Sequence, residues 1–208
     1  ALEFAKHTRE VIGVDLTAAM LKKAREMARR ENLSNVTFRR ANVNRLPFAD
    51  DSFDLVVTRA SFHHFSQPDC VLREMVRVVK RGGRILISDN TSSDETAKRR
   101  LHNRIEKLRD PSHAKLLPVR AWRKLFRDAG LQVVKEKLLV QQRNAEDWMK
   151  LSQTPSHVRR KIRRLFIQSM RGDKTGQNVR LVNGQIVFNM NYRIFVLARG
   201  LMKIKTCS

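Results

Sequence analysis

The sequence predicts an α/β fold built on a mostly parallel β-sheet. Two apolar segments, residues 53–57 and 84–89, have the composition of buried strands. Residues 68–79 lie between them and repeat their apolar side chains at helical spacing. Strand, helix and strand in this order form a βαβ unit, whose parallel strands are covered by helices. Ligands bind at the carboxyl ends of such strands, which here carry Thr58–Ala60 and Asp89–Asn90.

The composition indicates one folded, strongly basic domain. The chain has 208 residues, of which 41% are hydrophobic, and this suffices for a core. Lys and Arg number 43 against 20 acidic residues, which gives a net charge of +23. Such a charge favours polyanionic partners such as RNA, DNA or acidic lipid, or else forms a solvated basic surface. Aromatic residues make up only 6%, which argues against a platform for stacking single-stranded bases.

The sequence also bears on location. No apolar run approaches the roughly 20 residues that a membrane span needs, and the first residues do not resemble a signal peptide. Cys70 and Cys207 are far apart, so they suggest neither a metal site nor a disulfide framework. We therefore expect a reducing, cytoplasmic setting.

The remaining elements follow from periodicity and turn residues. Before residue 60 we expect a strand over 10–15, a helix over 17–31 capped by Thr17, a strand over 36–40 and a strand over 53–58. A turn at Gly82-Gly83 then leads into the strand over 84–89. After it we expect helices over 94–110, 118–129 and 145–170, a strand from 131, a hairpin over 180–187 with its turn at Asn183-Gly184, and a strand over 192–198.

Asp15 is the first candidate site residue. It follows an apolar strand and precedes a helix, where a carboxylate can accept both hydroxyls of a nucleotide ribose. The alternative is an acid that only caps the turn.

Several segments together resemble a known family. The chain is similar to class I S-adenosylmethionine-dependent methyltransferases that act on small molecules, including those of ubiquinone and menaquinone biosynthesis. The resemblance is carried by residues 11–15, 41–48, 51–54, 61–65 and 77–83. The resemblance is close over about residues 1–90. It extends to the helix that ends before Gly130 and the strand that follows Gly130.

The resemblance implies a Rossmann-like three-layer sandwich, with a mostly parallel sheet and antiparallel strands at the C-terminal end. Within a single domain we expect a core over 1–144, a helical lid over 145–178 and a C-terminal hairpin over 179–200. The family's first strand and glycine-rich loop are missing from the chain. We expect the strands ending at Asp15 and Thr58 to lack a partner between them. We favour an N-terminally truncated chain with weak cofactor affinity over a non-catalytic remnant.

The resemblance also implies a cofactor site for S-adenosylmethionine. Asp15 would hold the ribose, Leu16 would lie against the adenosine, and Asn42 and Val43 would contact adenine. Arg59 would line the cleft near the methionine portion of the cofactor. The alternative for Arg59 is a salt-bridged residue at the end of a strand.

His63 and His113 are the candidate catalytic residues, since histidine can act as a general base near neutral pH. His63 is followed by His64, but adjacent residues do not share a helix face, so we expect no metal site there. Either histidine of this pair could instead pack against or cap the following helix. His113 belongs to the polar cluster Arg109–His113, which could equally be a helix-ending turn around Asp110-Pro111.

The expected function is methyl transfer from S-adenosylmethionine to a small-molecule acceptor. The alternative is a basic nucleic-acid-binding protein on a non-catalytic methyltransferase scaffold, which the net charge supports. A basic amphipathic helix over 157–166 could contact RNA or a membrane surface, but we interpret it as part of the lid.

Overall fold

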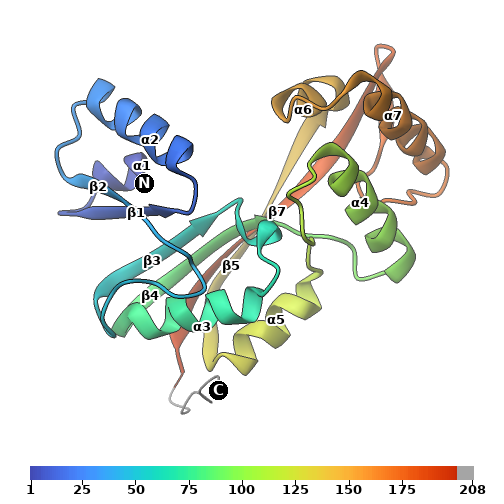
Figure 1. The fold of residues 1–208 in the computed structure, drawn as a ribbon. Coiled ribbons are helices and arrows are strands. Elements are labelled where there is room, and N and C mark those ends of the chain that lie inside the picture. The colour runs from blue at the N-terminus through green and yellow to red at the C-terminus, as the bar shows by residue number, and fades with distance from the viewer. Residues whose placement is uncertain (201–208) are drawn as a thin grey trace.

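The computed structural model describes residues 1–200 and shows strands alternating with helices (Figure 1). The first half contains α1 (Leu2–Ala5), β1 (Val11–Asp15), α2 (Ala18–Arg30), β2 (Val36–Arg40), β3 (Phe53–Arg59), the 3-10 turn η1 (Phe62–His64), α3 (Pro68–Val78) and β4 (Val79–Asn90). The second half contains α4 (Thr96–Arg109), α5 (Val119–Asp128), β5 (Leu131–Asn144), α6 (Ala145–Leu151), α7 (Ser156–Met170), β6 (Arg180–Val182) and β7 (Gln185–Arg199). The order of elements is broadly the one predicted, with three differences: the helix expected over 145–170 is divided into α6 and α7, the strands expected to 187 and over 192–198 form the single strand β7, and η1 was not predicted.

The strands form two sheets. In one, β1 and β2 pair in parallel; the other has the order β3-β4-β7-β5, with β6 paired to β7. Strands β3 and β4 are parallel, whereas β7 is antiparallel to β4, β5 and β6. The parallel pairs therefore come from the first half of the chain, and the antiparallel pairs involve its C-terminal strands, as predicted.

Strands β1 and β3 do not pair with each other. The ends that carry Asp15 and Arg59 lie in different sheets, in agreement with the prediction that no strand of this chain connects them. On β3 the side chains of Leu55 and Val57 remain partly exposed. Helices α3 and α5 cover one face of the five-stranded sheet, and α2 packs on β1 and β2 (Figure 1).

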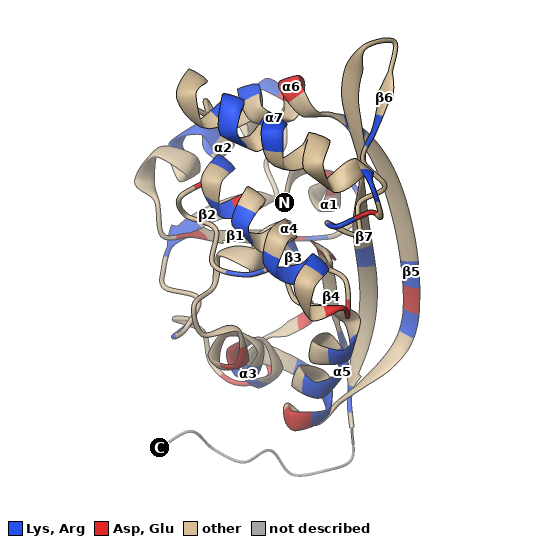
Figure 2. Ribbon diagram, turned by 90° about the vertical axis from the view of Figure 1, so that its right-hand side faces the viewer, with Lys and Arg blue, Asp and Glu red and all other residues tan. Residues whose placement is uncertain are grey.

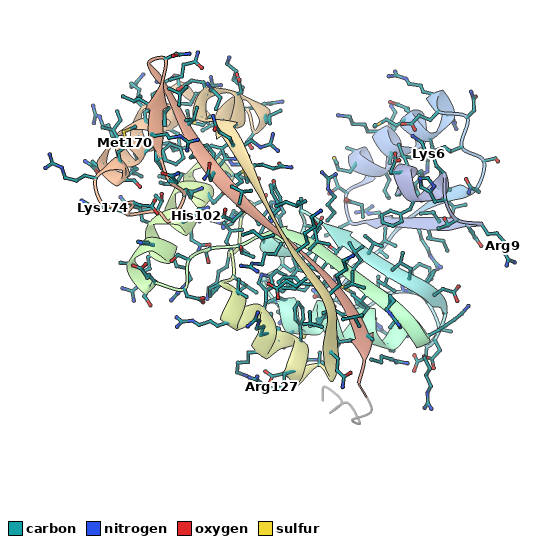
Figure 3. The ribbon with its side chains drawn as sticks, turned by 180° about the vertical axis from the view of Figure 1, so that it is seen from behind. Lys6, Arg9, His102, Arg127, Met170 and Lys174 are labelled. Atoms are coloured by element: carbon teal, nitrogen blue, oxygen red, sulfur yellow. The ribbon has the colours of Figure 1, made fainter. Side chains whose placement is uncertain are left out.

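Two hydrophobic cores hold the fold together, and β7 contributes to both. Helices α3 and α5 pack against β4 and the C-terminal end of β7, where Phe195 and Leu197 are buried. Helices α4, α6 and α7 pack against the other end of β7, where Phe188 and Met190 are buried. Seen from behind, β5 and β7 form a long twisted ribbon that joins the two parts (Figure 3). This ribbon positions the helical part above the carboxyl ends of β3 and β4.

Three turn predictions have different outcomes. Asn183 and Gly184 have φ angles of 49° and 72°, as the predicted hairpin between β6 and β7 requires. Gly82 and Gly83 do not form a separate turn, because β4 runs through them with an irregular register opposite β3. Thr17 occupies the position before α2, but its hydroxyl makes no capping bond. Instead, the Asp15 carboxylate accepts a hydrogen bond from the Thr17 backbone N–H at 2.7 Å.

Within residues 1–200, no helix combines the length and the apolar character that a bilayer span requires. Cys70 is half-buried with a free thiol, and Cys207 lies outside the described residues.

We expect Gly83→Ala to destabilise the fold. A Cβ at this position would lie 2.8 Å from the Asp54 carbonyl oxygen and 2.9 Å from a Val79 methyl group, so the β3–β4 contact must shift. Such overpacking costs about 1–3 kcal/mol, which urea denaturation can measure. The control is Gly82→Asn, because Gly82 has open space around its Cα and asparagine tolerates its φ of +80°. Equal losses in the two variants would contradict the steric explanation.

Candidate active site

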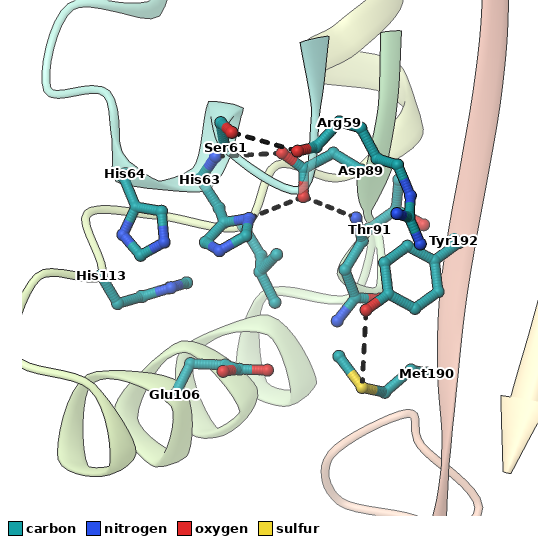
Figure 4. A network of polar contacts seen from close by, with 12 residues as sticks. Arg59, Ser61, His63, His64, Asp89, Thr91, Glu106, His113, Met190 and Tyr192 are labelled. Carbon is teal, nitrogen blue, oxygen red and sulfur yellow. Dashed lines mark hydrogen bonds and ion pairs between the residues drawn. The ribbon is translucent and has the colours of Figure 1, made fainter. Parts of the chain in front are cut away.

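The centre of the site is a hydrogen-bonded pair, His63 and Asp89. His63 lies in η1, directly after β3, and Asp89 lies at the end of β4. Since β3 and β4 are parallel with Arg59 opposite Ser88, both residues reach the same edge of the sheet. His63 Nδ1 lies 2.6 Å from Asp89 Oδ1, and the His63 backbone N–H donates to Asp89 Oδ2 at 3.2 Å (Figure 4). The Asn90 backbone N–H also donates to Asp89 Oδ1, at 2.7 Å.

This pairing sets the protonation of the imidazole. The Asp89 side chain is almost fully buried, and that of His63 is 15% exposed. Burial by itself lowers the pKa of His63, but the hydrogen bond to Asp89 and its charge outweigh burial, so the pKa is raised. Glu106 also raises it, and Arg109 acts in the opposite direction. With Nδ1–H held by Asp89, Nε2 is the nitrogen available to accept a proton.

The histidine rings at positions 63 and 64 lie together. Because His63 and His64 occupy a 3-10 turn rather than an α-helix, their ring centroids are only 4.2 Å apart, and the helix-face argument does not apply. His64 Nδ1 lies 3.1 Å from Ser112 Oγ, which donates to Asp110. The polar cluster Arg109–His113 therefore packs directly against η1. Within the described residues no group of three His, Cys, Asp or Glu side chains is arranged to hold a metal ion.

His113 lies behind His63, with 5.6 Å between the two ring centroids. It is only 1% exposed, and its Nε2 is 3.1 Å from the Asn103 side-chain oxygen. Burial lowers the pKa of His113 to about 4, so the ring is neutral near pH 7. Its surroundings favour a supporting position more than one that exchanges protons with a ligand.

A cavity of about 250 Å³ opens next to His63, between the strand ends and the helical part of the fold. Its lining comes from strands β4, β5 and β7, from η1, α4 and α6, and from the connecting segments at Ala60 and Leu116: Ala60, His63, His64, Asn90, Glu106, Arg109, Leu116, Arg143, Trp148, Leu151, Met190 and Tyr192. Sequence reasoning located the strand ends but missed Glu106, Arg143 and Tyr192. One available signal was that His102 and Glu106, spaced i and i+4, lie among the apolar residues of the helix over 94–110.

Glu106 is a buried charge in the wall of this cavity. Burial opposes its ionisation, but nearby positive groups outweigh burial and hold the pKa of Glu106 below its usual value. One carboxylate oxygen lies 3.7 Å from His102 Nε2, and the other accepts from Arg109 Nε at 3.3 Å. The carboxylate therefore fixes Arg109 at the cavity wall.

The four residues predicted for adenosine lie at the ends of β1 and β2. These strands are parallel with Asp15 opposite Arg40, and the Ala41 N–H donates to the Asp15 carbonyl at 3.2 Å. Asp15 is half-buried, whereas Leu16 is 62% exposed beside it. The Asn42 side-chain oxygen accepts from the Asn44 N–H at 2.9 Å, and Val43 packs on the first core. Asp15 and Asn42 thus follow the carboxyl ends of neighbouring strands.

Arg59 lies at the end of β3 with an exposed side chain. Within the described residues it forms no ion pair, so the structure does not support the alternative of a salt-bridged strand end. Burial, and after it the positive charge of Arg59, lower the pKa of the Ala1 α-amino group, so the two groups are close together. The guanidinium of Arg59 is therefore near the first residue of the chain, at the carboxyl end of β3.

These features define a Rossmann-like α/β protein with a polar cavity at the carboxyl ends of its strands. The chain belongs to a methyltransferase family: residues 1–153 match the family described as "Methyltransferase domain". S-Adenosylmethionine is the cofactor of this family. The comparison confirms the resemblance that the sequence motifs indicate.

Individual relatives agree with this assignment. The uncharacterized methyltransferase YcgJ of Bacillus subtilis is 33% identical over 165 residues, which cover 78% of this chain and 64% of YcgJ. The chain therefore spans slightly less than two thirds of that relative. The crystal structure of YcgJ superposes with a TM-score of 0.88, covering 97% of this chain and 87% of that one at 27% identity. The ubiquinone/menaquinone biosynthesis C-methyltransferase UbiE of Pectobacterium carotovorum is 39% identical over 79 residues, covering 38% of this chain and 32% of UbiE.

We expect Asp89→Asn to lower the pKa of His63 by about one unit or more, because it removes the opposite charge that outweighs burial. NMR titration of the His63 ring protons measures this change. In the parent chain the folded pKa of His63 lies above the unfolded value of about 6.5. The pair therefore stabilises the fold fully below that pH, and the contribution is lost as pH rises through the folded pKa.

In Asp89→Asn this loss of stability with rising pH should disappear. The matched control is Asp94→Asn, which removes an exposed carboxylate. An unchanged His63 pKa in Asp89→Asn, or an equal change in the control, would contradict the assignment.

Proposed function

We propose that this chain transfers a methyl group from S-adenosylmethionine to a small organic acceptor bound in the cavity. The observation that carries the proposal is the His63–Asp89 pair, which presents Nε2 at a cavity formed where the strands end. The family assignment supplies the cofactor, and the geometry supplies a base beside an acceptor-sized space. Helix α6 contributes Trp148 and Leu151 to the wall of this space, and α7 packs with α6 in the second core, which supports their role as a lid.

The residues at the ends of β1 and β2 fit the adenosine half of the cofactor. Asp15 Oδ1 is fixed by the Thr17 N–H, which leaves the second carboxylate oxygen for ribose hydroxyls. Leu16 provides an exposed apolar surface beside it, and Asn42 provides an amide for adenine. Arg59 has a guanidinium that suits the methionine carboxylate. When bound, S-adenosylmethionine supplies a methyl group activated by its positively charged sulfur.

His63 then acts on the acceptor. Asp89 keeps the proton of the imidazole on Nδ1, so that Nε2 accepts the proton that an acceptor hydroxyl or amine must lose. Burial of the pair keeps water away from it and holds the ring in one orientation. His113, neutral and packed behind His63, supports the ring without adding a charge.

The nucleic-acid alternative stays a sequence-based expectation. Lys and Arg are distributed over many helices and strands (Figure 2). The relatives described above are methyltransferases, and their names mention no nucleic acid. We therefore rest the proposal on the cavity rather than on the net charge.

Asp15→Asn should weaken binding of S-adenosylhomocysteine by about tenfold, because one oxygen that accepts from ribose is replaced by a donor. The asparagine oxygen can still accept from Thr17, so the turn is kept. NMR titration measures this affinity. Asp128→Asn, an exposed change on α5, is the control. Unchanged binding in Asp15→Asn would contradict the ribose role.

His63→Gln should lower methyl transfer by about a hundredfold or more, the usual effect of removing a general base. The measurement is the rate of S-adenosylhomocysteine formation with a panel of small hydroxy acids and amines, followed by mass spectrometry. Binding of S-adenosylhomocysteine should stay unchanged, which separates a role in proton transfer from a general loss of structure. His157→Gln, an exposed histidine on α7, should keep full activity. Full activity in His63→Gln would exclude His63 as the base.

A further inference from the structure

Asn90 is a polar side chain without a partner in the cavity wall. It is 3% exposed, and neither its side-chain oxygen nor its side-chain nitrogen has a hydrogen-bond partner among the described residues. Its backbone is fixed, since β4 pairs with β7 and places Asn90 opposite Tyr192. An unsatisfied buried group costs about 1–3 kcal/mol, and the Asn90 amide carries two of them. A ligand group that both donates and accepts, such as a hydroxyl, would satisfy the amide.

The opposite end of the cavity carries positive charge. Two guanidinium groups line the cavity, that of Arg109 on α4, which is paired with Glu106, and that of Arg143 on β5, whose side chain is exposed. Arg109 is already engaged with Glu106, with the Ser152 hydroxyl and with the Trp148 ring 4.5 Å away. Arg143 donates only to the neutral Gln141 side chain, at 2.7 Å, among the described residues. One positive charge therefore remains without an acidic partner at this end.

The wall of the cavity also contains apolar side chains. Leu116, Trp148, Leu151 and Met190 contribute to its walls, and the volume of about 250 Å³ lies just below the usual range for drug-sized ligands. Arg143 and Asn90 cannot hold the same group, because Arg143 pairs with Phe188 in the ladder, several residues along β7 from Tyr192. The cavity thus suits a short molecule with an apolar body and a different polar group at each end.

We infer that the methyl acceptor is a small hydroxy acid, with its carboxylate at the Arg109–Arg143 end and its hydroxyl at the Asn90–His63 end. This inference rests on the methyl-transfer function proposed above and adds the class of acceptor. Arg143 determines specificity for the acid, and Asn90 positions the hydroxyl next to His63 Nε2. The apolar body lies against the Trp148 side of the cavity.

The test uses three acids, 4-hydroxybenzoate, 4-hydroxyphenylacetate and 3-(4-hydroxyphenyl)propionate, each compared with its neutral amide by calorimetric titration of the full chain. At least one acid should bind about tenfold or more tightly than its amide, the size expected for a charge-assisted hydrogen bond. Arg143→Gln should abolish this preference. The control Lys137→Gln removes one positive charge from an exposed position on β5, and this variant should retain the preference for the acid over the amide. Equal affinity for acids and amides, or no binding by any of the three acids, would overturn the inference.

Asn90→Leu gives a readout that separates ligand binding from a structural role. Since it removes two unsatisfied groups, the urea midpoint of unfolding should stay the same or rise, while affinity for the hydroxy acid falls by about tenfold. A lower midpoint with unchanged affinity would show a structural residue and overturn the positioning role. S-Adenosylhomocysteine titration distinguishes the two proposals. If the chain binds S-adenosylhomocysteine but shows no preference for acids, the hydroxy-acid inference fails and the methyl-transfer proposal is unaffected. If it prefers acids but does not bind S-adenosylhomocysteine, only the methyl-transfer proposal is contradicted.

Discussion

The antiparallel pairing of β7 is the constraint on which the rest of the structure depends. Strand β7 is the only strand of residues 1–200 that contributes buried side chains to both hydrophobic cores. Its ladder with β5 extends from Leu131 to Asn144, and its ladder with β4 ends at Asn90. These two registers fix how far the helices of the second core stand from the ends of β3 and β4. The cavity is the space that results, so its dimensions are set by strand pairing rather than by loops.

The polar groups within that space are stable because each buried charge is compensated. Asp89 accepts from the His63 ring and from two backbone N–H groups, and Glu106 is held between His102 and Arg109. A buried carboxylate without such partners would cost several kcal/mol. Several neutral polar atoms beside these charges have no hydrogen-bond partner among the described residues: both side-chain polar atoms of Asn90, His113 Nδ1 and His102 Nε2. Among these residues Asn90 differs in that both polar atoms of its side chain lack a partner while the residue lines the cavity.

Much of the fold could be predicted because its signals are local. Apolar runs, helical spacing and the Asn183-Gly184 turn each depend on a few neighbouring residues. The Gly82-Gly83 segment does not separate α3 from the strand as predicted, because β4 already begins at Val79 and its register with β3 jumps from Phe53–Val79 to Leu55–Arg84, which only the pairing reveals. At the site, His63 and Asp15 could be selected from their places after strands. The proximity of His63, His64 and His113 could not, since it depends on a 3-10 turn and on the docking of residues 110–115 against it. Arg143 and Tyr192 enter the cavity only through the long ladder, which no local pattern encodes.

The sequence positions that line the cavity also constrain how the protein is made. They extend from Ala60 to Tyr192, and the second core needs Phe188 and Met190 from β7. During synthesis on the ribosome, the parallel β3–β4 unit can form early, but α4, α6 and α7 have no sheet to pack on until β7 has emerged. Nascent chains that stop short of β7 therefore leave the apolar faces of these helices open to solvent and to chaperones. The strand that completes the site is therefore also the strand whose synthesis allows these apolar helix faces to be buried.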